Sequence, residues 1–171
     1  MTAGRLFAGS LVLAILCVAG FAFWTPGLTR GAELSFDRRI GGYGLKEAET
    51  YLRWLAVNKL TVTYLGAFRW IDSVFPLAVF GLLASGVWGL WARPARMVAL
   101  LGCGLAVVYL GADYVENARV AGLLRAGPDA LTASQVSSAS LATQVKWIGI
   151  FAPSLLILAG LLLTAIKGGR Q

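Results

Sequence analysis

Four long apolar runs dominate this sequence, and they limit what the chain can fold into. The runs cover about residues 6–24, 73–91, 97–113 and 147–166. An α-helix needs about 20 apolar residues to cross the roughly 30 Å of hydrocarbon in a bilayer, so each run is of suitable length. The apolar residues fall in long runs rather than in the periodic pattern of a soluble domain, which indicates helices that span a membrane. The sequence therefore predicts an all-α, integral membrane four-helix bundle.

The composition supports a bilayer as the solvent of these runs. Hydrophobic residues make up 58% of the chain and charged residues only 13%, whereas a soluble domain carries about 25% charged residues. We therefore expect residues 1–171 to form a single transmembrane domain.

The first connection, residues 25–71, is the one sizeable polar stretch. Its beginning, residues 27–44, is rich in glycine and arginine and predicts an irregular loop. The segment from Leu45 to Leu55 has helical periodicity, which predicts an extra amphipathic helix in the first outer loop. Its apolar face would carry Leu45, Ala48, Leu52 and Leu55.

A second helix start lies before the fourth apolar run. The sequence Thr132-Ala-Ser-Gln135 matches a capping box, in which two side chains satisfy the first free backbone N–H groups of a helix. We expect this helix to continue into the fourth run, so that its first turns stand in water or among lipid headgroups.

The distribution of charge predicts the orientation. Three segments carry arginine or lysine and no acid: the amino terminus (Arg5), the second connection (Arg93 and Arg96) and the carboxyl tail (Lys167 and Arg170). Short basic segments stay on the cytoplasmic side of a membrane. Both termini should therefore be cytoplasmic, in a multi-pass protein of the bacterial inner (cell) membrane.

The composition also argues against several functions. The chain has no histidine, and its two cysteines, Cys17 and Cys103, lie inside apolar runs at different depths, where we expect free thiols. It has no nucleotide-binding loop, nucleophile motif or set of metal ligands, so we expect no cofactor and no metal. The net charge of +7 forms no basic patch on a water-facing domain, which argues against a nucleic-acid partner.

One group of polar residues lies where the second and third runs meet the outer interface. Asp72 begins the second run, and Asp113, Glu116 and Asn117 end the third run at helical spacing. A tight connection makes the two helices antiparallel, so these residues should share one depth. The candidate site comprises Asp72, Asp113, Glu116 and Asn117, the flanking Arg69 and Arg119, and Tyr109 one turn deeper.

Carboxylates at membrane depth are costly unless they are paired or hydrated, so this group suggests a function. The interpretation that we favour is a structural latch, in which Asp72 and Asp113 pair with Arg69, with Arg119 or with free backbone amides where the helices leave the bilayer. A binding site for an ion or a lipid headgroup is the second reading. Acid–base catalysis is the third, and no catalytic residue is assigned. A pocket that opens toward lipid beside Asp113 would favour a ligand over a latch.

The same residues carry a family resemblance. The residues that carry it are, in order, Tyr51, Tyr64, Asp72, Phe75-Pro76 and Asp113-x-x-Glu116-Asn117. With these residues, the chain resembles an uncharacterised family of small bacterial four-helix membrane proteins, over about residues 43–117. The resemblance implies no activity, and it implies only that Asp72, Asp113, Glu116 and Asn117 are the positions to test.

Taken together, these features favour a non-catalytic accessory, assembly or lipid-organising component of the membrane. Its partners would be membrane lipids and either another membrane protein or a second copy of the chain. The alternative is a small membrane enzyme, or an ion- or lipid-binding protein, that uses the carboxylate group at the outer interface.

The orientation can be tested by cysteine labelling in intact cells, in a chain whose Cys17 and Cys103 are replaced by alanine. A cysteine at Ala95 should react with a membrane-permeant maleimide but not with an impermeant one, because the second connection is basic and cytoplasmic. A cysteine at Asp129, in the opposite connection, should react with both reagents. Labelling of position 95 by the impermeant reagent would show that the orientation is reversed.

Overall fold

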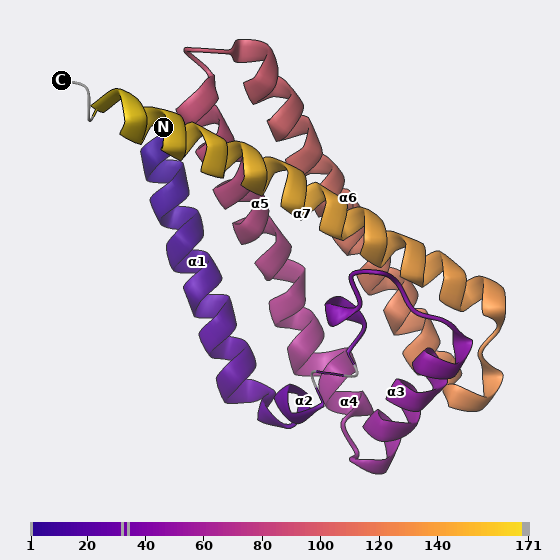
Figure 1. The fold of residues 1–171 in the computed structure, drawn as a ribbon. Helices are drawn as coiled ribbons and strands as arrows, with labels where there is room; N and C mark the ends of the chain where they lie inside the picture. Colours follow the sequence, from indigo (N-terminus) through magenta and orange to yellow (C-terminus); the bar gives the residue numbers. More distant parts are fainter. Residues whose placement is uncertain (1, 32, 34, 169–171) are drawn as a thin grey trace.

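The computed structural model describes residues 2–31, 33 and 35–168, and the regular secondary structure in these ranges is helical (Figure 1). The prediction of an all-α chain is confirmed. Four helices are long: α1 (Ala3–Trp24), α5 (Arg69–Trp91), α6 (Arg96–Ala126) and α7 (Ala133–Gly168). The shorter segments are α2 (Pro26–Arg30), η2 (Phe36–Arg38), α3 (Leu45–Val57), α4 (Thr61–Thr63), η3 (Tyr64–Phe68) and η4 (Pro128–Ala130).

The long helices have the length and surface of membrane spans. Each is long and apolar enough to cross a membrane, α5 together with the preceding α4 and η3. Large apolar side chains remain exposed along them, including Leu11 and Ile15 on α1 and Leu155 and Leu161 on α7. Soluble monomers rarely expose apolar patches of this extent. The fold is therefore compatible with a multi-pass membrane protein.

Each long helix packs on the next long helix in the sequence. α1 packs on α5, α5 on α6, and α6 on α7, while α7 also contacts α5. The start of α1 and the end of α7 lie at one end of the molecule, and α2, α3 and α4 lie at the other (Figure 1). Gly149 allows α7 to approach α6 closely, since a Cβ there would lie 2.7 Å from the Cα of Tyr109. Cys17 and Cys103 are both free, as predicted.

A cap, formed by residues 26–31, 33 and 35–57, covers the end of the bundle opposite the start of α1 and the end of α7 (Figure 1). The predicted amphipathic helix is present as α3, and it buries Ala48, Leu52 and Leu55 of the expected face together with Tyr51. These side chains share a hydrophobic core with residues at the far ends of the two longest helices, Val120, Leu123 and Leu124 of α6 and Val136 and Ala139 of α7.

Helices α6 and α7 are longer than the apolar runs that predicted them. α6 continues to Ala126, although the third run ends near residue 113, because its later apolar residues pack on the cap rather than on lipid. α7 begins at the expected capping box: the Thr132 amide donates to Gln135 Oε1 (3.0 Å), and the Gln135 amide donates to Thr132 Oγ1 (3.3 Å). Hydropathy thus predicts the continuous apolar part of each helix and not its ends.

Pro76 lies inside α5 and leaves a backbone carbonyl free to accept a hydrogen bond from α6. Proline has no backbone N–H, so the carbonyl of Asp72, four residues earlier, loses its helical donor. Asn117 on α6 donates its side-chain N–H to this carbonyl (3.3 Å), and the Tyr114 hydroxyl donates to the neighbouring carbonyl of Ser73 (2.9 Å). The two α6 side chains therefore satisfy the backbone at the proline and fix the register of the two helices.

Candidate functional site

A buried lysine lies at the centre of the polar residues near the cap. Lys146 on α7 is only 4% exposed. Its Nζ lies 2.5 Å from Oδ1 of Asp37 and 3.4 Å from Oδ1 of Asp113, and it also forms an ion pair with Glu116. We call these four residues the lysine cluster. It joins α6 and α7 of the bundle to η2 of the cap.

Each acidic residue of the lysine cluster also has a neutral partner. Thr143 Oγ1 donates to Glu116 Oε1 (2.5 Å), Asn117 Nδ2 donates to Asp113 Oδ2 (3.2 Å), and Trp147 Nε1 donates to the backbone carbonyl of Asp37 (3.0 Å). The bonds to Glu116 and Asp113 offset part of the hydration that these buried carboxylates give up, whereas the bond to Asp37 holds only its backbone. The charges do not balance, however, because three carboxylates face one ammonium group.

A large cavity lies beside the lysine cluster. Its volume is about 680 Å³, within the range of small-molecule sites. Helix α1 contributes Phe21 to the lining, and α7 contributes Trp147 and Ile150. The charged lining residues are Asp37, Arg38, Asp72, Asp113 and Lys146, and the aromatic ones are Phe21, Tyr51, Tyr64, Phe68, Phe75, Tyr109 and Trp147.

The aromatic residues form a connected wall of the cavity. The ring centroids of Tyr64 and Phe68 are 4.6 Å apart, those of Phe68 and Phe21 are 4.9 Å apart, and those of Phe21 and Phe75 are 5.8 Å apart. Tyr64 and Phe68 are the two ends of η3, a π-helical turn, and such turns are frequent at functional sites.

Tyr51 adds a polar group to this wall from the cap. Burial, and then the nearby Asp37 carboxylate, raise the pKa of Tyr51 well above its ordinary value. Its phenol is therefore neutral at physiological pH and remains available as a hydrogen-bond donor.

The structure brings together most of the residues that the sequence singles out. Asp72, Asp113 and Tyr109 line the cavity, Glu116 belongs to the lysine cluster, and Asn117 links the Asp72 backbone to the Asp113 carboxylate. Arg69 and Arg119 are placed differently. In the part of the chain that the structure describes, neither forms an ion pair with these carboxylates, and each lines a separate pocket. Lys146 supplies the cation that the sequence interpretation assigned to the two arginines.

Sequence reasoning missed two members of the lysine cluster, Lys146 and Asp37. Lys146 carried a usable signal, because it directly precedes the fourth apolar run. The start of that run lies at the same end of the bundle as the end of the third, so the depth argument that aligned Asp72 with Asp113 applies to Lys146 as well. The prediction of an irregular loop over residues 27–44 is incomplete, because most of α2 and all of η2 lie in this stretch, and Asp37 belongs to η2. Such short helical turns have no periodicity that could place Asp37 from the sequence.

Removing the buried cation should destabilise the fold. Lys146→Gln should lower the free energy of unfolding by about 3–5 kcal/mol, since it leaves Asp113 and Glu116 buried without a cation. Thermal melting in detergent, followed by circular dichroism, measures the change. Lys167→Gln is the matched control, because Lys167 is on the same helix and exposed. Equal melting temperatures for the two variants would show that the lysine cluster contributes nothing to stability.

The chain matches no protein-family model, and neither the curated proteins nor the solved structures contain a match to it. The family resemblance suggested by the motifs at Asp72 and at Asp113–Asn117 therefore stays a prediction.

Proposed function

We propose that this protein crosses a membrane four times and serves as a non-catalytic lipid-binding component, with an amine-bearing amphiphile in the cavity between α1 and α7. The proposal rests on one observation: the side chain of Asp72 lines an aromatic cavity. No ion pair or hydrogen bond of its carboxylate is found among the described residues. A carboxylate of this kind is costly in an apolar site unless a donor or cation joins it.

Helix lengths support a position for the cavity at one surface of the bilayer. Counting about 1.5 Å per residue from Arg96, Glu116 lies about 30 Å along α6, which equals the thickness of the hydrocarbon core. A similar count from Lys167 puts Lys146 about 30 Å along α7. With both termini in the cytoplasm, the lysine cluster lies at the outer boundary and the cap lies among the outer headgroups.

Charge and shape favour a cationic head on the ligand. The cavity is lined by three carboxylates and by the cations Arg38 and Lys146. Lys146 is already shared among three carboxylates, one of them Glu116 behind the lining. A primary amine or a quaternary ammonium group would neutralise Asp72, and aromatic faces such as Tyr64 and Phe68 attract such cations. The acyl chains of the ligand would extend from the cavity into the membrane between α1 and α7. These two helices pack on α5 but little on one another.

The latch interpretation accounts for only part of these observations. In the lysine cluster the three carboxylates all pair with Lys146, and these ion pairs can hold the cap without any ligand. The cavity and the Asp72 carboxylate have no role in such a latch. A ligand site beside a structural cluster accounts for both.

Native mass spectrometry of the purified full chain tests the proposal with added phosphatidylethanolamine. The cavity variant is Val79→Trp, because Val79 lines the cavity on α5 and a larger side chain fills it. It should lower lipid retention about tenfold or more, as expected when a few good contacts are lost. The matched control is Val74→Trp, the same change at an exposed position of the same helix. Equal retention by the two variants would show that the cavity is not the binding site.

The role of the amine is tested with a second pair of variants. Asp72→Asn should weaken binding of phosphatidylethanolamine and leave binding of phosphatidylglycerol, which lacks the amine, unchanged. Asp129→Asn is the control, since this carboxylate is exposed and pairs with Arg53 at the surface. If Asp72→Asn weakens both lipids alike, or neither, then Asp72 does not recognise an amine.

A further inference from the structure

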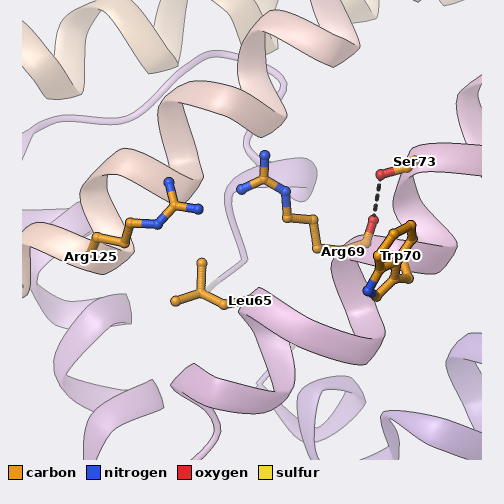
Figure 2. A pocket seen from close by; sticks show the side chains of 5 residues that line it. All are labelled: Leu65, Arg69, Trp70, Ser73 and Arg125. Carbon is orange, nitrogen blue, oxygen red and sulfur yellow. Dashed lines mark hydrogen bonds between the residues drawn. The ribbon is translucent and has the colours of Figure 1, made fainter.

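A second pocket near the cap has the opposite charge. It encloses about 220 Å³ and shares no lining residue with the large cavity. Figure 2 shows the guanidinium groups of Arg69 on α5 and Arg125 on α6 pointing toward one another across this space. We call it the arginine pocket, and its lining residues are Leu65, Arg69, Trp70, Ser73 and Arg125.

The two arginines have no counter-charge among the residues that the structure describes. No acidic residue lines the arginine pocket. Within residues 2–31, 33 and 35–168, neither Arg69 nor Arg125 takes part in an ion pair. Nη1 of Arg69 is also buried without a hydrogen-bond acceptor. Arg125 is exposed, so water screens much of the repulsion between the two guanidinium groups, but a buried N–H group without an acceptor destabilises a fold. An anion in the pocket would accept from this N–H group and lie between two positive charges.

We propose that the arginine pocket binds a phosphate group at the membrane surface, either the phosphate of an anionic lipid or free phosphate. Two guanidinium groups offer planar, paired N–H donors that match phosphate oxygens better than lysine does. The Arg69 backbone is fixed at the pocket, since the Ser73 hydroxyl donates to its carbonyl (2.8 Å, Figure 2). Trp70 beside it is 78% exposed, and tryptophan is enriched at the level of lipid headgroups.

The position of the pocket fits a lipid phosphate. Arg69 precedes Asp72 by about one helical turn, so it lies just outside the depth that the large cavity occupies in the membrane placement proposed above. Headgroup phosphates lie directly outside the hydrocarbon core. The pocket holds a phosphate and part of its glycerol, while acyl chains would lie against the apolar surface of α5. The anion chemistry of the pocket itself does not depend on what the large cavity binds.

Native mass spectrometry of the full chain in detergent tests the proposal with three probes: short-chain phosphatidylglycerol, inorganic phosphate and an uncharged short-chain diacylglycerol. Arg69→Gln and Arg125→Gln should each raise the apparent Kd for the phosphate-bearing probe about tenfold or more, the usual effect of losing a charge-assisted hydrogen bond. The matched control is Arg119→Gln, which removes an exposed charge from the same helix as Arg125 and should change the Kd less than about twofold.

The outcomes separate the two phosphate sources. Arginine-dependent binding of phosphatidylglycerol alone identifies a lipid headgroup, and arginine-dependent binding of inorganic phosphate as well identifies a general phosphate site. The proposal is overturned if the Arg69→Gln, Arg125→Gln double variant binds every probe as Arg119→Gln does, or if diacylglycerol binds as tightly as phosphatidylglycerol. If the glutamine variants do not fold, Arg69→Lys keeps the charge but loses the paired donors and should still weaken binding. Val74→Trp, at an exposed position of α5, should leave the arginine-dependent binding unchanged, and inorganic phosphate, which has no acyl chain, keeps the test independent of the large cavity.

Discussion

The burial of one ammonium group among three carboxylates governs the arrangement of the cap end of this protein. Lys146 is nearly inaccessible to solvent, and its partners come from η2 and α6. A buried charge loses its hydration, so it tolerates only an arrangement in which opposite charges surround it. Such a requirement is directional and specific in a way that apolar packing against lipid is not. It therefore positions the cap over the bundle and sets the rotation of α6 against α7.

The lysine cluster is one end of a polar path through the bundle. The path starts at Pro76, which leaves the carbonyl of Asp72 without its helical donor, and continues through Asn117 to Asp113. From Asp113 the path continues through the ion pairs of Lys146 to Asp37 in the cap. Helix α1 takes no part in this path and is held mainly by its packing on α5. A large cavity can therefore persist between α1 and α7, since no polar link draws these two helices together.

Sequence alone could predict those features that depend on local periodicity and on helix length. The four long helices, the buried face of α3 and the capping box at Thr132 follow from spacing, and the structure has all three. The shared face of Asp113, Glu116 and Asn117 follows from helical geometry in the same way. Arg69 and Arg119 are near the carboxylates in sequence, but Lys146 is the cation that lies near them in space. Helix depth could have placed Lys146 level with Asp113 and Glu116, whereas nothing in the sequence places Asp37 of the cap beside them. The cavity also escaped prediction, since it arises from how side chains of several elements pack.

The most direct test of the central role of Lys146 is a double-mutant cycle for the free energy of unfolding. The cycle combines Lys146→Gln with Glu116→Gln, two substitutions that remove charge and keep most of the side-chain volume. If the amine is neutralised by this carboxylate, removing both should cost less than the sum of the single changes, with a coupling of about 2 kcal/mol. Additive effects, equal within about 0.5 kcal/mol, would contradict a buried ion pair at the centre of the fold.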